Sequence, residues 1–194
     1  FMKACFRGHK DVVRLLLDHS ERIELNARDN NGRTAFLSAC MNGHKDVVKL
    51  LLDNSERIEL NARCHFSGFT AFMSACINGH KDVVKLLLDH FERIEPNARS
   101  SHGWTAFMLA CQQGHKDVVK LMLDHSDRIE LNAIAKGNRS KGQTAYIEAC
   151  KHGHKDVVKL LLEHPDINTE VKHGTLITKC YCFDQFCEWH QKKT

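Results

Sequence analysis

One hexapeptide, GHKDVV, recurs at nearly constant spacing and constrains the fold more than any other feature. It begins at residues 8, 43, 79, 114 and 153, so successive copies lie 35, 36, 35 and 39 residues apart. A second motif, TAF or TAY, begins at residues 34, 70, 105 and 144 and keeps the same register. A period of this length is typical of a solenoid, in which each unit packs only against its neighbours. The sequence therefore predicts a stack of similar units.

Two helices are predicted in each unit, as the stretch 29–52 illustrates. Thr34 is a typical N-cap residue, and Gly43 stands where a glycine ends many helices. A second helix is predicted to begin near His44. Apolar residues recur at the spacing of a buried helical face, with Ala35, Phe36, Ala39 and Cys40 in the first helix and Val47, Val48, Leu50, Leu51 and Leu52 in the second. The polar linker after each pair ends in a glycine, which predicts a projecting turn.

The stretch DNNGRTAFLSACMNGHKDVVKLLL at 29–52 resembles the ankyrin repeat, whose unit reads D-x-x-G-x-T-P-L-H-x-A-A-x-x-G-H-x-x-V-V-x-L-L-L. The resemblance recurs with changes at 66–88, 101–123 and 140–162, and so covers almost the whole chain. Ala35 replaces the usual proline and Leu37 the usual histidine, which affects local capping and not the architecture. The resemblance implies an all-α fold: an ankyrin-type solenoid of stacked helix-turn-helix units with projecting β-turn fingers.

We expect a single ankyrin-repeat domain over residues 1–194. Its units are expected at about 1–28, 29–65, 66–100, 101–139, 140–173 and 174–194. The first unit begins inside its first helix, and the last is expected to be a degenerate C-terminal capping unit. Capping units usually present a polar outer face, whereas Phe1 and Met2 are apolar. We therefore also expect further repeats before Phe1 in the natural protein.

Composition excludes several classes of protein. A hydrophobic content of 42% and a charged content of 27% are those of a globular protein. The formal net charge of +4 is too small to predict nucleic-acid binding by itself, and no apolar run is long enough for a membrane helix. The nine cysteines are an odd number, and five stand at one recurring position, which favours free thiols over disulfides. We expect a cytoplasmic protein, with the nucleus as an alternative, that is monomeric as an isolated array.

A cysteine stands four residues before a histidine in each of the first five units. The pairs are Cys5/His9, Cys40/His44, Cys76/His80, Cys111/His115 and Cys150/His154. Zinc needs four ligands at about 2.0–2.3 Å, whereas packed helices lie about 8–10 Å apart, so neighbouring pairs cannot share an ion. A nucleophile needs one oriented base in one pocket, not five equivalent copies. We therefore predict a buried thiol and a histidine that bonds backbone groups at the turn, with no catalytic centre and no cofactor.

A second group of metal-ligand residues lies near the C-terminus, at Cys180, Cys182, Cys187 and His190. In a helix, three of the four share an arc with apolar side chains, and Cys182 lies opposite. This pattern favours a terminal helix that covers the last full unit. A metal or redox site at these cysteines is the alternative.

The positions that vary between otherwise similar units are the turn tips and the residues just before each Gly-His. The resemblance implies that such positions form a concave partner-binding surface. Candidate contacts are Arg33, Met41, Asn42, Phe66, Phe69, Ile77, Asn78, His102, Trp104, Gln112, Gln113, Lys141, Gln143, Lys151 and His152; Phe6 and Arg7 hold the same places in the first unit. Phe66, Phe69 and Trp104 are the expected apolar anchors. The alternatives are neutral variation at exposed sites and, for Phe69 and Trp104, docking onto the neighbouring turn.

We therefore expect a protein–protein interaction module that binds a protein partner of unknown identity. The alternative is a spacer or regulatory arm of a larger enzyme or channel. Lys136, Arg139 and Lys141 make the fourth turn basic, which suits a solvated loop or an acidic partner segment, whereas nucleic acid is a weaker candidate.

Asparagines recur in the linkers, at Asn26, Asn61, Asn97 and Asn132. They resemble the turn asparagine of ankyrin units that an oxygen-dependent hydroxylase modifies. Their default role is to bond the turn backbone.

Overall fold

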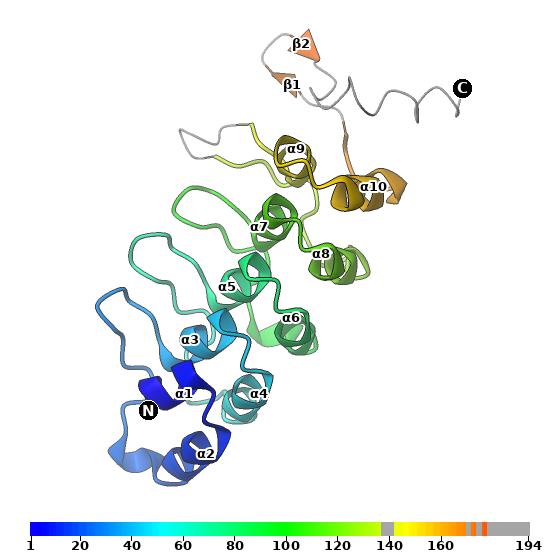
Figure 1. Cartoon of the computed structure of the whole chain (residues 1–194). Coiled ribbons are helices and arrows are strands. Elements are labelled where there is room, and N and C mark those ends of the chain that lie inside the picture. The colour runs from blue at the N-terminus through cyan, green and yellow to red at the C-terminus, as the bar shows by residue number, and fades with distance from the viewer. Residues whose placement is uncertain (137–141, 170–171, 174–175, 178–194) are drawn as a thin grey trace.

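The computed structural model describes residues 1–136, 142–169, 172–173 and 176–177. Its described part is a stack of five helix pairs (Figure 1). The pairs are α1 (Met2–Arg7) and α2 (Lys10–Asp18), α3 (Ala35–Met41) and α4 (Lys45–Asp53), α5 (Ala71–Ile77) and α6 (Lys81–Leu88), α7 (Ala106–Gln113) and α8 (Lys116–Leu123), and α9 (Ala145–Lys151) and α10 (Lys155–Glu163). Short 3-10 turns follow α2 and α6, at Ser20–Arg22 and Phe91–Arg93. The predicted all-α solenoid is confirmed.

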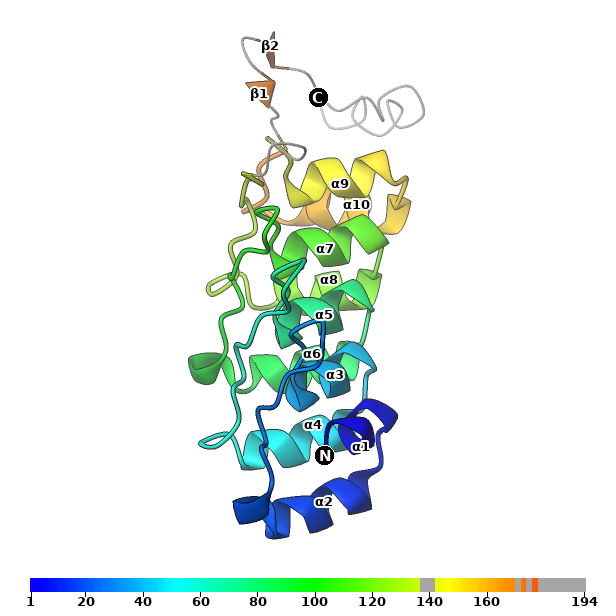
Figure 2. The same cartoon turned by 90° about the vertical axis from the view of Figure 1, so that its left-hand side faces the viewer.

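The odd-numbered helices form one row, called here the inner helices, and the even-numbered helices form the other, the outer helices (Figure 1). The linkers between pairs end in turns, called fingers, that project beside the inner helices. Figure 2 views the array from the finger side and shows the fingers one above another in front of the helix rows.

The predicted helix signals operate in each unit. The Thr34 hydroxyl accepts a hydrogen bond from the Leu37 N–H at 3.2 Å, and the three later fingers repeat this cap. Gly43 follows the end of α3 with a left-handed φ of 73°, which an L side chain rarely adopts. His44 then stands at the N-cap position of α4. Local capping therefore marks where α3, α5, α7 and α9 begin, whereas the outer helices begin after a histidine that makes no side-chain cap bond.

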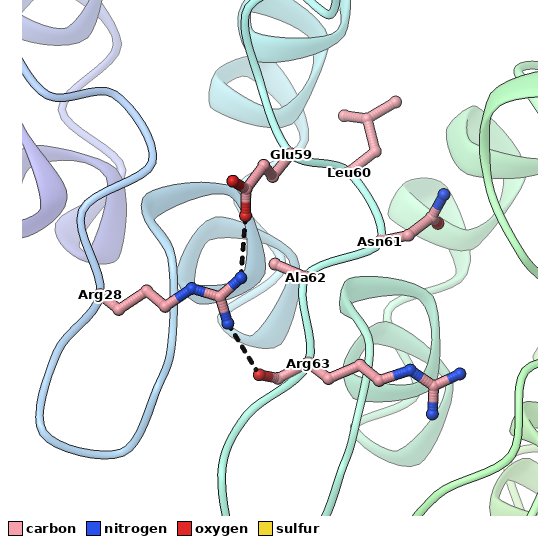
Figure 3. A pocket seen from close by; sticks show the side chains of 6 residues that line it. All are labelled: Arg28, Glu59, Leu60, Asn61, Ala62 and Arg63. Atoms are coloured by element: carbon pink, nitrogen blue, oxygen red, sulfur yellow. Dashed lines mark hydrogen bonds and ion pairs between the residues drawn. The ribbon is translucent and has the colours of Figure 1, made fainter.

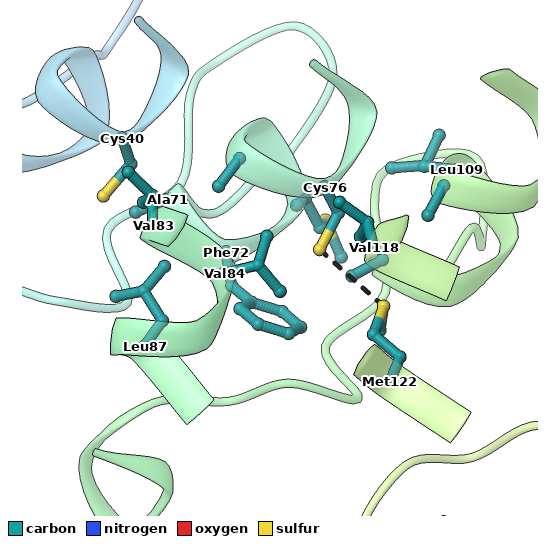
Figure 4. Packing of buried hydrophobic residues seen from close by; sticks show 14 of the residues in the cluster. Cys40, Ala71, Phe72, Cys76, Val83, Val84, Leu87, Leu109, Val118 and Met122 are labelled. Atoms are coloured by element: carbon teal, nitrogen blue, oxygen red, sulfur yellow. Dashed lines mark hydrogen bonds between the residues drawn. The ribbon is translucent and has the colours of Figure 1, made fainter. Parts of the chain in front are cut away.

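The core lies between units as much as within them. Cys76 of α5 approaches Met122 of α8, in the next unit, with 3.9 Å between the two sulfurs (Figure 4). On α4, four of the five predicted core residues are buried, but Leu50 is only half-buried. At 100° per residue, Leu50 falls outside the arc that the other four share. The prediction of a five-residue buried face is corrected at this position.

The fingers are tight turns that also bond to one another. The Asp29 N–H donates to the Arg33 carbonyl at 3.0 Å, and the Ser100 N–H donates to the Trp104 carbonyl at 2.9 Å. Between fingers, the His65 N–H donates to the Asn31 carbonyl at 2.8 Å. The predicted projecting turns thus form a continuous backbone-bonded edge along the first fingers.

The linker asparagines clamp adjacent units together. The Asn61 side chain donates to the Arg93 carbonyl at 3.1 Å and accepts from the Glu95 N–H at 3.0 Å. Asn26, Asn97 and Asn132 make the same two bonds to the linker that follows theirs. The predicted backbone-bonding role is confirmed, and the bonded backbone belongs to the next unit.

Beyond α10, the described residues include two short antiparallel strands, β1 (Lys172–His173) and β2 (Leu176–Ile177). The expected degenerate unit at 174–194 is therefore described only at Leu176–Ile177, which form a strand and not the start of a helix. The candidate metal ligands Cys180, Cys182, Cys187 and His190 lie outside the described residues.

Candidate partner-binding face

The recurring histidine fixes the backbone at the end of each preceding inner helix. The His80 Nε2 atom lies 2.9 Å from the Met41 carbonyl oxygen, and the His115 Nε2 atom lies 2.9 Å from that of Ile77. His44 and His154 repeat this contact with the carbonyls of Phe6 and Gln112. The predicted bond of this histidine to backbone is confirmed. The repeated residue thus holds the carbonyl of a variable residue and leaves that residue's side chain to face outward.

The paired cysteines are buried thiols, as predicted. Cys40, Cys76 and Cys111 have no exposed surface, and burial raises the pKa of each thiol well above its ordinary value. A protonated, inaccessible thiol is a poor nucleophile and a poor metal ligand. Within the described residues, no cluster of three or more histidine, cysteine or acidic side chains is arranged to hold a metal ion.

The variable side chains at the ends of the inner helices and on the fingers form a surface that we call the inner face. At the inner-helix ends of the first three units its members include Phe6, Met41 and Ile77, one at the end of each successive helix. Phe6 is 45% exposed, and Met41 and Ile77 are partly exposed. Because adjacent inner helices pack on one another, these three side chains form a row across the stack.

The three predicted aromatic anchors differ in their surroundings. Phe66, at a finger tip, is 79% exposed, the highest exposure among the large apolar side chains of the described chain. Phe69 and Trp104 are partly buried and pack against the core. Because both side chains are partly buried against the core, Phe66 is the strongest anchor candidate of the three.

Several polar candidates form hydrogen bonds to other residues of the repeat array. The Asn42 and Asn78 amides donate to the carbonyls of Ser38 and Ser74, each at 2.8 Å. The Arg33 N–H donates to the Asp29 carboxylate at 2.8 Å, while the Arg33 side chain stays half-exposed. Gln113 and His102 are exposed, and Lys141 lies outside the described residues.

A buried carboxylate in the last described helix pair has four of the predicted site residues around it. Glu148 of α9 is 2% exposed. The Gln112 amide donates to one of its oxygens at 3.2 Å, and the Gln143 amide, oriented by its partners, donates to the other. Lys151 lies 3.5 Å from the carboxylate, and the His152 ring nitrogen lies 3.0 Å from the Glu148 carbonyl oxygen. A buried charge is tolerated only with such partners.

Sequence reasoning missed Glu148, although a signal was present. The same position holds Ser38, Ser74 and Leu109 in the preceding units, so it varies as much as the positions predicted to contact a partner. The cluster ties a finger residue, Gln143, to two inner helices. The inner face therefore ends in a polar cluster at the fifth helix pair.

A shallow pocket lies on the linkers and not on the inner face (Figure 3). Its lining residues are Arg28, Glu59, Leu60, Asn61, Ala62 and Arg63. The Arg28 guanidinium donates to the Glu59 carboxylate at 2.8 Å and to the Arg63 carbonyl at 3.2 Å. Since its polar groups join one linker to the next, the pocket is part of the contact between units.

Comparison with known proteins agrees with this architecture. A family model described as "Ankyrin repeats (3 copies)" matches residues 1–64, 55–135 and 92–173. A search of curated proteins finds no match. Across the described part of the chain, no helix has both the length and the apolar character needed to cross a membrane. The match spans residues 1–173 of 194. The chain belongs to the ankyrin-repeat family.

Proposed function

We propose that this chain is a protein–protein interaction module that binds its partner across the inner face. Ankyrin repeats are generally protein-interaction modules, and the fold is typically a non-catalytic binding module. The observation that carries the proposal for this face is Phe66, a large aromatic side chain left 79% exposed at a finger tip. Exposed aromatic residues of this kind are enriched among the dominant contacts of protein interfaces.

The neighbouring residues support the same surface. The partly exposed Met41 and Ile77 extend the apolar area along the inner helices, and the polar cluster around Glu148 limits it at the fifth helix pair. An apolar centre beside a polar rim is the usual anatomy of a protein interface. The histidine and asparagine bonds between units make this surface rigid, which lowers the entropy lost on binding.

The test compares partner capture by three forms of the whole chain. They are the natural sequence, Phe66→Ala, and Leu15→Ala, a matched control because Leu15 is 60% exposed on the outer helix α2. Burying one large apolar side chain contributes about 1.5–3 kcal/mol, so Phe66→Ala should weaken binding about 10- to 100-fold. Leu15→Ala should leave binding unchanged.

Binding is measured by titrating each captured protein against the three forms, and thermal unfolding confirms that all three remain folded. Capture that resists Phe66→Ala but is lost with Leu15→Ala would place the binding surface on the outer helices. That result would contradict the proposal.

A further inference from the structure

The outer helices carry no net charge. Each contains two basic and two acidic residues, counting the residue that follows α6 and α8. Their charges also pair between units: Lys45 lies 3.9 Å from Asp82, and Lys81 lies 3.9 Å from Asp117. The outer side of the stack therefore compensates its own charge.

The linkers are compensated in the same way. Arg28 pairs with Glu59 at 2.8 Å, and Arg99 pairs with Glu130 at 3.2 Å. Each of the first three linkers contributes two arginines and two glutamates, so they add nothing to the net charge. The formal excess of +4 must therefore arise elsewhere.

The inner helices and fingers carry this excess. Among their described residues, Lys3, Arg7, Arg33 and Lys136 form no ion pair with another described residue. Their two carboxylates are both used internally. Asp29 accepts the backbone N–H groups of Asn31 and Arg33, and Glu148 is buried among its donors. The inner face thus presents more cations than anions, and neither carboxylate forms an ion pair with any of these four cations.

These cations lie at the two ends of the inner face. Lys3, Arg7 and Arg33 lie at the first and second helix pairs, and Lys136 lies on the fourth finger. Lys151 ends the fifth inner helix, but its charge is paired with the buried Glu148 carboxylate at 3.5 Å, so Lys136 is the unpaired described cation at this end. The middle of the face carries no charged residue from 64 to 79 or from 100 to 114, the two fingers and inner helices that include Phe66 and Ile77. Along the inner face, from the first unit to the fifth, the surface is therefore positive, then apolar, then positive.

The spacing of the units sets the length of a matching partner. Four steps between packed helices, at about 8–10 Å each, separate α1 from α9 and amount to about 32–40 Å. An extended chain rises about 3.3 Å per residue, so roughly 10–12 residues span this length. Nucleic acid fits less well, because its evenly spaced phosphates would face the uncharged, apolar centre.

We infer that the inner face binds an extended protein segment of about 10–12 residues with acidic residues at both ends and apolar residues in its centre. This inference rests on the proposed function and adds the chemistry of the partner. Charge complementarity of this kind sets the rate and specificity of association, while the apolar centre supplies most of the affinity.

The test selects displayed random peptides of 12 residues on three forms of the chain. They are the natural sequence; an inner reversal, Arg7→Glu with Lys136→Glu; and an outer reversal, Lys85→Glu with Lys120→Glu. Lys85 and Lys120 are exposed on α6 and α8, and both double variants change the net charge by the same amount. Unfolding of each form is measured so that a loss of binding is not a loss of fold.

The expected peptides from the natural chain have acidic ends and an apolar centre. At low salt the inner reversal should weaken their binding about tenfold or more, whereas the outer reversal should change it less than about twofold. Any other composition of the ends, including no enrichment over the unselected library, overturns the inference. A single-stranded oligonucleotide that binds more tightly than every selected peptide also overturns it.

The proposed function is judged separately with Phe66→Ala. Peptides with neutral ends that lose affinity in Phe66→Ala would leave the proposed function intact and contradict only the inferred chemistry. Peptides whose affinity depends on neither Phe66 nor the inner cations would contradict both.

Discussion

The outer helices α2 and α4 have nearly the same sequence, KDVVRLLLD and KDVVKLLLD, yet they bury different surfaces. Val12 of α2 is 48% exposed, whereas Val47, at the same position of α4, is 1% exposed. Leu15 is 60% exposed, while its counterpart Leu50 is half-buried. The difference arises because α4 has a described neighbour on both sides and α2 has one. Burial in this chain is therefore a property of the stack and not of the unit's own sequence.

The glycines before the recurring histidine make the same point. Gly43 and Gly153 have nearly equal φ values, 73° and 71°. A Cβ atom on Gly43 would lie 2.6 Å from the Nδ1 atom of His80, the histidine of the next unit. A Cβ on Gly153 would meet no described atom within 4 Å. Local geometry is thus shared by all units, whereas close contact requires a neighbour.

The largest expected effect comes from placing a charge on the two equivalent valines. Val47→Asp should lower the free energy of unfolding by about 4 kcal/mol or more, because an unpaired carboxylate would be buried. Val12→Asp should cost about 1 kcal/mol or less, since water reaches that side chain. Urea unfolding followed by circular dichroism measures both. Equal losses would contradict the view that neighbours, and not the unit, create the core.

The second comparison uses the two glycines. Gly153→Ala should cost about 1–2 kcal/mol from the left-handed backbone alone. Gly43→Ala should cost about 1 kcal/mol more, because the new methyl group displaces His80 and breaks its hydrogen bond to the Met41 carbonyl. The same unfolding experiment compares them, and Gly43→Ala combined with His80→Ala removes the clash. If Gly43→Ala is no more destabilising than Gly153→Ala, the close histidine contact does not constrain the stack.

Much of the fold was predictable because its signals are local and repeated. Thr34 as a cap, Gly43 beyond the helix end and the apolar spacing of α4 each depend on a few consecutive residues. The repeat period then placed every later copy. Leu50 was predicted wrongly because it lies beside the arc that the buried residues of α4 share, so it stays half-buried although α4 has a neighbour on both sides.

The contacts between units were less predictable. Asn61 was expected to bond turn backbone, but residues with a period of about 36 cannot show whether the bond lies within one unit or crosses to the next. The cluster at Glu148 is harder still, because Gln112 and Gln143 approach it from another inner helix and a finger. Exposure separated Phe66 from Phe69 and Trp104, although all three are aromatic residues near finger tips.

A third prediction concerns the buried thiols and alkaline pH. Burial raises the pKa of Cys5 to about 12 and that of Cys76 further, from an ordinary value of 9.0. Above pH 9 the unfolded thiols lose protons that the native thiols keep, so the free energy of unfolding falls as pH rises. Each thiol contributes about 1.4 kcal/mol per pH unit in this range.

Urea unfolding at pH 7 and pH 10 measures this loss. Cys5→Ala and Cys76→Ala should each reduce it, and by equal amounts, because both native thiols stay protonated at pH 10. This result would sharpen the comparison of the end with the interior, since the inner helix of the first pair would be as protected as later ones while its outer helix is not. An unchanged loss in Cys76→Ala would show that its thiol ionises in the native state.

The smallest effect is expected for the lysine–aspartate pairs along the outer helices. Lys45 and Asp82 have exposed side chains, at 57% and 72%, and their charged atoms lie 3.9 Å apart. Exposed pairs of this kind contribute about 0.2–1 kcal/mol and are screened by salt. Lys45→Ala should therefore lower the free energy of unfolding by less than about 0.5 kcal/mol, and the double-mutant cycle with Asp82→Ala should give a coupling that vanishes in 1 M salt. A larger, salt-resistant coupling would mean that charge pairing holds adjacent units together. The buried valines instead predict that apolar packing, together with the hydrogen bonds of the linker asparagines to the next unit's backbone, does so.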